Sequence, residues 1–340
     1  MDPSRDRYSQ NPNAATIDVL QDLATYYDQT KDRWRTLGYR KAIRTLVKQT
    51  TKIITKEAIR LPGIGESIAT KIEEIVQTDG LRKFNYIRDD PKEKVLRLFL
   101  GVYDVGLAQA SKWYQAGYRT LADLRAGSHA TPLTANQIVG IEHYDDFAAR
   151  IPRHEVAAHG EIVRTALRHL DPACSVTVMG FYRRGATDSG DIDLLISKPG
   201  APSFMLRDIV FSQLLPHLAS ILFVKATLAG SGSKAGSKWH GASCLPDSTV
   251  WRRLDILLVP DTELGASLLY FTGNEVFNRS MRLLARRRGM RLNQYGLFGD
   301  VVRRGRAMRI NDGTLIEAKD EKRIFEVLGV LWREPEERCC

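Results

Sequence analysis

One stretch near the middle of the chain joins a basic, glycine-punctuated loop to a buried strand. The loop covers residues 179–193, with the sequence MGFYRRGATDSGDID, and the apolar run Leu194-Leu195-Ile196 follows it. Residues two apart in a strand point to the same face of a sheet, so Asp191 and Asp193 project together. This chain must therefore bury a strand whose start carries two carboxylates.

A third carboxylate, Asp255, lies in a similar apolar setting, within the run RLDILLV of residues 253–259. Three carboxylates on adjacent strands repel one another unless cations neutralise them, and oxygen ligands suit Mg²⁺ or Mn²⁺. Two metals so held can activate a hydroxyl and neutralise a leaving pyrophosphate. Acids that cap strand ends would explain one aspartate, but they explain an Asp-x-Asp pair with a third strand acid poorly. With Arg183-Arg184-Gly185 and Ser189-Gly190 beside them to bind phosphate, these residues predict nucleotidyl transfer.

Positive charge is in excess and unevenly distributed. The 340 residues are 43% hydrophobic and 26% charged, typical of a globular protein, and the net charge of +10 favours polyanionic partners. Residues 31–94 contain 16 lysines and arginines against 9 acidic residues, and residues 276–310 contain 10 arginines against one aspartate. Two basic segments indicate a polyanion held at two places, although two solvated basic faces would have the same composition. We expect no membrane anchor, since no apolar run approaches spanning length, and no pair of the four cysteines has metal-ligand spacing.

The pattern of the chain changes from helical to β-rich near residue 151. Residues 1–13 are polar, and we expect a disordered arm. Between residues 14 and 147 the apolar residues recur at helical spacing, with a break at Asp89-Asp90-Pro91. A helix over 153–170 precedes short β-rich runs, at 175–179, 192–197, 221–228 and 254–259. The C-terminal part mixes helices with short extended pieces.

Leu61-Pro-Gly-Ile-Gly65 is a candidate helix–hairpin–helix turn. Its glycines allow a close approach to a phosphate, and the following helix N-terminus offers free N–H donors, although a plain helix–helix turn also needs glycine. A second copy at residues 104–106 has Asp104 where a glycine is expected. Lys71 lies in the helix after the first turn, among Ile68, Ile72 and Ile75. A partly desolvated lysine can attack an aldehyde to form a Schiff base, but a single lysine is more often a surface ion-pair partner.

Tyr270-Phe-Thr-Gly273 precedes a helix that carries Asn278, Arg279 and Arg282 on neighbouring turns. Aromatic faces can pack on a sugar and base, while Arg and Asn can reach the acceptors of the minor groove. An aromatic core pair with a basic solvent face is the ordinary alternative, and from this segment alone it is favoured.

Taken together, these segments resemble the family X DNA polymerases. The matching stretches follow the order of that family and extend over roughly residues 14–338. They are Asp32–Ile43, Leu61–Gly65, Gly80–Lys83, Tyr182–Gly185, Ser189–Asp193, Arg252–Asp255, Leu268–Gly273, Phe277–Arg282 and Trp332–Pro335.

The resemblance implies a multidomain α+β fold. Its segments would be a disordered arm (1–13), an all-α lyase subdomain (14–88), a DNA-binding helix–hairpin–helix subdomain (89–150), a nucleotidyltransferase palm with a mixed β-sheet (151–262) and a small α+β nucleotide-selection subdomain (263–340). It also implies a monomeric, nuclear, template-directed polymerase that adds dNTPs to a primer 3′-hydroxyl in gapped or nicked double-stranded DNA. Base excision repair and end joining are the implied pathways, with a 5′-deoxyribose phosphate lyase as a second activity.

The resemblance also implies roles for individual residues of the polymerase site. Asp191 and Asp193 would bind both metals and Asp255 the catalytic one. The other implied residues contact the incoming triphosphate (Arg150, Arg184, Gly190), its sugar and base (Tyr270, Phe271, Gly273, Asn278), and the template strand (Arg279, Arg282).

For the lyase, Lys71 matches the Schiff-base lysine. The remaining implied residues lie in the 5′-phosphate pocket (Arg35, Tyr39, Lys83) and at the helix–hairpin–helix turns that contact the DNA backbone (Gly63, Gly65, Gly106), where a monovalent cation can bind.

Three residues depart from the family pattern. Phe181 stands where relatives carry a serine that contacts the triphosphate, Ser67 replaces a basic residue, and Thr70 replaces an acidic residue beside Lys71. Template-independent relatives carry Gly-Trp where this chain has Tyr270-Phe271, so template-directed synthesis is favoured. A terminal transferase and a non-catalytic scaffold that binds DNA ends are the alternatives.

Overall fold

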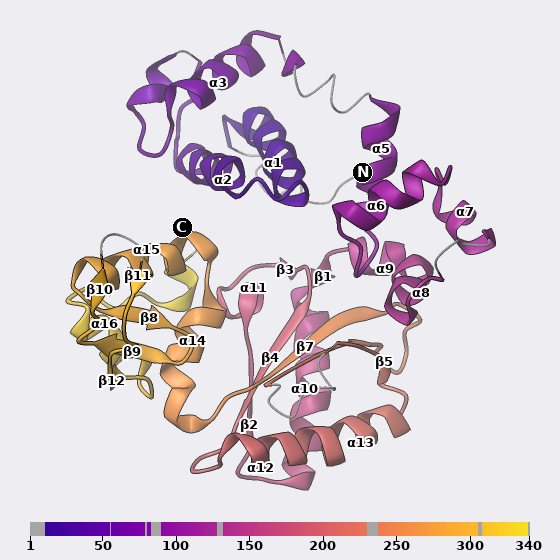
Figure 1. The fold of residues 1–340 in the computed structure, drawn as a ribbon, viewed down its shortest axis with the longest axis vertical. Coiled ribbons are helices and arrows are strands. Elements are labelled where there is room, and N and C mark those ends of the chain that lie inside the picture. Colours follow the sequence, from indigo (N-terminus) through magenta and orange to yellow (C-terminus); the bar gives the residue numbers. More distant parts are fainter. Residues whose placement is uncertain are drawn as a thin grey trace. The chain divides into compact units, whose positions relative to one another are not determined.

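The computed structural model describes residues 11–54, 56–78, 80–82, 90–127, 132–229, 237–304 and 308–338. The chain divides into two compact units, residues 1–144 and 145–340, each described by itself below (Figure 1). The described part of the first unit is helical, and every described strand lies in the second. This arrangement confirms the predicted multidomain α+β fold, while the finer division into five segments stays a prediction. None of the described helices has the length and apolar character needed to cross a membrane.

The first unit begins with helices that share one apolar core: α1 (Ala14–Gln29), α2 (Arg33–Val47), the short η2 (Lys56–Arg60) and α3 (Glu66–Thr78). The helical spacing read from the sequence is borne out, since Ile17, Leu20 and Leu23 of α1 and Ile72 and Ile75 of α3 are all buried. The Asp32 side chain caps α2 by accepting from the backbone N–H of Arg35.

A second helical group completes this unit: α5 (Pro91–Leu100), α6 (Leu107–Gln115), α7 (Leu121–Ala126) and α8 (Ala135–Glu142). Its core is built around Phe99 and Trp113, whose ring centroids lie 5.5 Å apart in an edge-to-face arrangement. In the turn before α6, Asp104 adopts a left-handed backbone with φ +62°. Aspartate tolerates this conformation better than most residues, so the turn forms although the expected glycine is missing. The short helix α9 (Tyr144–Ala148) follows at the boundary between the units.

The second unit is organised around a mixed five-stranded sheet of order β2-β4-β7-β6-β5. Its strands are β2 (Ser175–Val178), β4 (Ile192–Ser197), β5 (Val224–Ala229), β6 (Lys238–Ser243) and β7 (Arg252–Leu258). Only the central pair among these strands, β4 with β7, is parallel. The sequence had predicted four of the five strands; β6 was missed.

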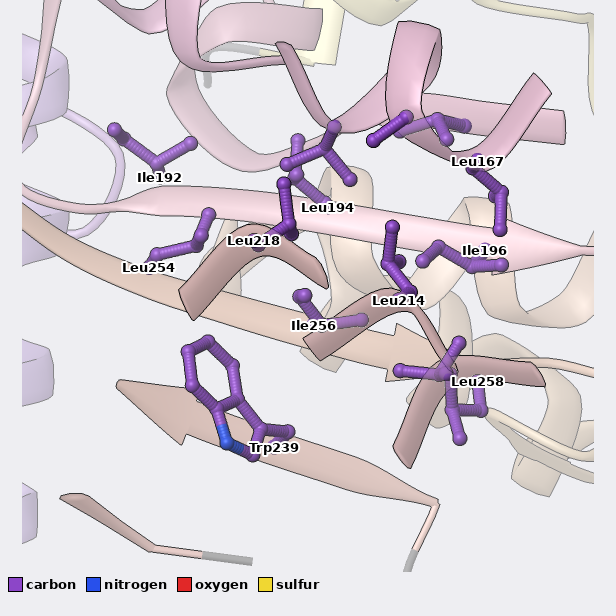
Figure 2. Close-up of a cluster of buried hydrophobic side chains, with 14 of the residues drawn as sticks. Leu167, Ile192, Leu194, Ile196, Leu214, Leu218, Trp239, Leu254, Ile256 and Leu258 are labelled. Carbon is purple, nitrogen blue, oxygen red and sulfur yellow. The ribbon is translucent and has the colours of Figure 1, made fainter. Parts of the chain in front are cut away.

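Helices cover one face of this sheet. They are α10 (Arg153–Leu170), α12 (Ser203–Arg207), the π-helical η3 (Asp208–Leu214) and α13 (Leu215–Ser220). Alternate residues Ile192, Leu194 and Ile196 of β4 pack there against side chains such as Leu214 and Leu218 (Figure 2). Asp193 and Asp255 therefore belong to the opposite face, which the strand alternation predicted.

The C-terminal part of this unit packs helices on a small sheet. The helices are α14 (Leu264–Thr272), α15 (Glu275–Arg287), α16 (Glu321–Val327) and the short η4 (Asp261–Glu263) and η5 (Pro335–Arg338). The sheet has the order β12-β9-β8, from Thr314–Glu317, Gly296–Gly299 and Arg291–Asn293, and β10 (Arg303–Arg304) pairs separately with β11 (Met308–Arg309). A buried core that includes Phe277, Met281 and Phe325 joins the helices to this sheet.

Candidate active site

The predicted acids meet on the sheet face that the palm helices leave uncovered. Asp193 of β4 and Asp255 of β7 are direct partners in the parallel pairing, and Asp191 lies one residue before β4. The loop that precedes them starts with α11 (Gly180–Arg183), and the Met179 N–H donates to the Asp193 carbonyl at 2.8 Å. The sheet register thus holds two of the three carboxylates side by side.

Gly180 allows this loop to approach the carboxylates closely. Its backbone is left-handed, with φ +57°, and a Cβ at this position would lie 2.5 Å from Oδ2 of Asp193. A side chain would therefore have both an unfavourable backbone and no room.

The carboxylates destabilise one another in their charged form. Burial, followed by the charges of Asp191 and Asp255, raises the pKa of Asp193 to about 7. Burial also raises the pKa of Asp255, although His240 opposes this shift. A bound cation would relieve both effects, because it replaces lost hydration and neutralises the repulsion.

Two of the acids have basic side chains as partners. Asp191 Oδ2 lies 2.9 Å from Nη2 of Arg253, and Asp255 Oδ1 lies 2.8 Å from Nδ1 of His240. Among the residues that the structure describes, no three acidic, His or Cys side chains already point at one common point. The donor chemistry fits a hard divalent cation, but Asp191 and Asp255 would have to turn from these partners to share one.

Arg253 and His240 were missed as parts of the site. Arg253 carried a local signal, because it lies two residues before Asp255 in the same strand and shares its face. His240 had none: it faces Asp255 only because β6 pairs with β7 in a register that places the two residues opposite each other.

The structure brings the predicted triphosphate contacts together beside the acids. Arg150 reaches over the loop, so that a Cβ on Gly190 would lie 3.1 Å from its Nη1. Arg150 also forms an ion pair with Asp188, with 2.5 Å between Nη2 and Oδ1. Asp188 belongs to β3 (Asp188–Ser189), which pairs with β1 (Ile151–Pro152). Arg184 is buried and donates to the Thr272 carbonyl, and a Cβ on Gly273 would lie 3.2 Å from its Nη1.

The residues predicted to contact the sugar and base gather where α14 ends. The Asn278 amide donates to the Tyr270 carbonyl at 2.6 Å, and the rings of Tyr270 and Phe271 meet edge to face at 4.8 Å. The Arg282 guanidinium lies 4.7 Å from the Tyr270 ring centroid. Arg279 pairs with Glu275, and both are more than 40% exposed, so this arginine is open to an exchange of partners.

The predicted lyase residues lie in the first unit. Lys71 Nζ donates to the Ser67 hydroxyl at 2.8 Å and to its carbonyl at 2.9 Å. Tyr39 is buried and stacks on Tyr27 with 5.6 Å between ring centroids, and burial raises the pKa of Tyr39 to about 12. Arg35 is exposed and pairs with Asp32. Lys83 lies outside the described residues.

The two candidate DNA-backbone turns have different geometries. Gly63 is left-handed, with φ +85°, and Thr45 Oγ1 donates to the Pro62 carbonyl at 2.6 Å, which ties the first turn to α2. A Cβ on Gly65 would meet no atom within 4 Å, and the same holds for Gly106 in the second turn. Both glycines therefore leave open space beside the backbone, as a phosphate would require.

A cavity of about 880 Å³ lies within the second unit, between α10, α13 and residues 245–248. No residue predicted for the polymerase site lines it. The chemistry belongs to the acidic face of the sheet, since that face combines charge, glycines and arginines.

Comparisons with known proteins divide the chain into four matched segments. Family models match a helix-hairpin-helix domain at residues 11–81, the fingers domain of DNA polymerase lambda at 97–148, a DNA polymerase beta palm at 150–261 and a DNA polymerase beta thumb at 267–339. The chain is similar to DNA polymerase lambda of Rattus norvegicus, with 38% identity over 332 residues, and to that of Arabidopsis thaliana, with 32% identity. These alignments cover 96% of the chain, which spans 56% and 62% of the two relatives.

Proposed function

The chain belongs to the family X DNA polymerases, and from this we propose that it is a template-directed polymerase that adds dNTPs to a primer 3′-hydroxyl in gapped DNA. One observation carries the proposal: Asp193 and Asp255 are direct partners on adjacent parallel strands, with Asp191, Arg150 and Arg184 around them. Carboxylates beside arginines suit a metal-bound triphosphate.

Different residues would have different roles in an in-line displacement at the α-phosphorus. Polymerases of this family use divalent metal ions. We propose Mg²⁺, held by Asp191, Asp193 and Asp255, which would lower the pKa of the attacking hydroxyl and neutralise the leaving pyrophosphate. Arg150 and Arg184 would orient the triphosphate, with the Gly190 backbone close to it. Asn278 and the Tyr270-Phe271 pair would hold the sugar and base of the nucleotide.

A second activity, the 5′-deoxyribose phosphate lyase, is part of the same proposal. The Lys71 amino group donates a hydrogen bond to the Ser67 hydroxyl, which would hold the amine in place; the amine must release a proton to solvent before it can attack an aldehyde. We also propose a role in short-gap repair and a nuclear location. A monovalent cation at the two helix–hairpin–helix turns completes the proposal.

A gap-filling assay with and without a template tests the polymerase. We expect extension with Mg²⁺ on gapped DNA, its loss in Asp193→Ala, and unchanged DNA binding by that variant. Asp208→Ala, a palm acid away from the site, is the control. Extension by Asp193→Ala would refute the assignment, and equal extension of a single-stranded primer without a template would favour a terminal transferase.

A further inference from the structure

Two arginines predicted to contact the triphosphate share one aromatic ring. The Phe181 ring centroid lies 4.5 Å from Cζ of Arg184 and 5.0 Å from Cζ of Arg150. Both distances fall within the range in which a guanidinium is attracted to the negative face of a ring. Arg150 and Arg184 are 34 positions apart in sequence, so it is the fold that brings both to this ring.

Core packing does not account for a phenylalanine at this position. Phe181 remains 37% exposed, and it lies on the loop that leads to the acids rather than in a buried cluster. More than a third of its area stays in contact with water, so burial alone does not explain an apolar ring here. The contacts of this ring with Arg150 and Arg184 indicate a function for it other than core packing.

The two arginines carry like charges, and both lie against this one ring. Two guanidinium groups repel each other, and long side chains lose rotamer freedom when they are fixed. Arg184 is anchored by its bond to the Thr272 carbonyl, and Arg150 by its ion pair with Asp188. The ring lies against both, so it can keep the two cations in place before any phosphate arrives.

We propose that Phe181 is a positioning residue that holds Arg150 and Arg184 ready for the triphosphate of the incoming nucleotide, an inference that rests on the proposed polymerase function. The ring makes no hydrogen bond to phosphate. It acts through the two guanidinium groups, which keep the orientation they need in the ternary complex. Preorganised cations lower the entropic cost of binding, so the effect falls on nucleotide affinity rather than on the chemical step.

The experiment compares Phe181→Leu, which keeps the apolar volume, with Phe181→Tyr, which keeps the ring. Equilibrium binding of the correct dNTP is measured on one-nucleotide-gap DNA with a dideoxy primer end, together with single-turnover insertion on the extendable substrate. Phe211→Leu is the matched control, because it removes another ring beneath a guanidinium, that of Arg207, elsewhere in the palm. Thermal melting checks that each variant is folded.

We expect Phe181→Leu to weaken dNTP binding about tenfold, with the maximal insertion rate changed about twofold or less. Phe181→Tyr and Phe211→Leu should both bind within about twofold of the parent chain. Unchanged or tighter binding by Phe181→Leu would overturn the inference, as would an equal loss in Phe181→Tyr. If the parent chain itself neither binds dNTP nor extends the primer, the proposed function fails with it.

Discussion

Asp193 and Asp255 lie directly opposite each other where β4 pairs in parallel with β7. The backbone hydrogen bonds between the two strands set the separation of their backbones, and residues such as Leu194 and Ile256 pack on the opposite face. Asp191 differs, because it lies on the loop before β4 and pairs with Arg253. The sheet register therefore fixes the backbone positions of Asp193 and Asp255, whereas the backbone of Asp191 belongs to a loop.

The crowding of these acids predicts a stability cost in the absence of metal. Asp193→Asn keeps the shape of the side chain and removes a buried charge, so in EDTA at pH 8 it should raise the free energy of unfolding by roughly 1–3 kcal/mol. Mg²⁺ should raise the melting temperature of the parent chain but not of this variant. Thermal melts with and without Mg²⁺ measure both effects. Asp208→Asn should behave as the parent chain, and a destabilised Asp193→Asn would contradict the prediction.

Gly180→Ala should damage activity more than stability. Gly180 and Gly200 both have left-handed backbones, so alanine at either costs about 1–2 kcal/mol. A Cβ at Gly180 would also push against Asp193 Oδ2, whereas one at Gly200 meets no atom within 4 Å. We expect Gly180→Ala to lose about a hundredfold in insertion rate, because small misplacements at a reacting centre are that costly. Gly200→Ala is the control, and equal insertion rates in the two variants would disprove this explanation.

The acids could be predicted from the sequence because strand alternation is a local signal. The pattern Asp191-Ile-Asp193 followed by Leu194 fixes both the strand and the face. Strand β6 could not be predicted, since Lys238–Ser243 contains Gly241, Ala242 and little β-branched character. It is a strand because β5 and β7 pair with its two edges. The contact of His240 with Asp255 depends on this pairing, so it could not be predicted from the sequence either.

Phe181 shows the same limit in another form. The sequence predicted a lost hydroxyl at this position, because relatives carry a serine there. The contact of its ring with Arg150 depends on β1 pairing with β3, which no local pattern encodes. The residues of the candidate site were readable from sequence, but several of the contacts between them were not.

The lyase proposal predicts covalent trapping through Lys71. Borohydride should link the chain to an abasic 5′-end, and Lys71→Ala should abolish this product. Ser67→Ala should slow trapping by several fold, because it removes the hydroxyl that Lys71 Nζ contacts at 2.8 Å. The product is measured by denaturing gel electrophoresis. Lys48→Ala removes a lysine of the same unit outside α3 and should leave trapping intact; undiminished trapping by Lys71→Ala would assign the nucleophile elsewhere.

His159 predicts a loss of stability in mild acid. It is fully buried, its Nδ1 lies 3.0 Å from the Ser243 hydroxyl, and burial lowers its pKa from 6.5 to about 4. Between pH 6.5 and 4 the unfolded chain binds a proton that the folded chain does not. The stability from neutral His159, on the order of 3 kcal/mol, is therefore present above pH 6.5 and lost as the pH falls through this window. Urea unfolding at several pH values should show that the free energy of unfolding depends less on pH in His159→Gln than in the parent chain. The variant His154→Gln, at an exposed histidine, should keep the full pH dependence.

Glu321 links η5 to the loop of residues 179–193, and its loss should be costly. Its carboxylate receives Arg338 at 2.5 Å and Arg183 at 2.8 Å, and Arg338 is fully buried. Glu321→Ala would leave two guanidinium groups without this acid, at a cost of about 3–5 kcal/mol in unfolding free energy. Glu326→Ala, in the same helix, breaks an exposed pair with Arg323 and should cost less than about 1 kcal/mol. Denaturant unfolding compares the two variants. Equal stabilities of Glu321→Ala and Glu326→Ala would show that the buried acid does not stabilise the fold. Because Arg183 is adjacent to Arg184, we expect the milder Glu321→Gln to weaken dNTP binding as well.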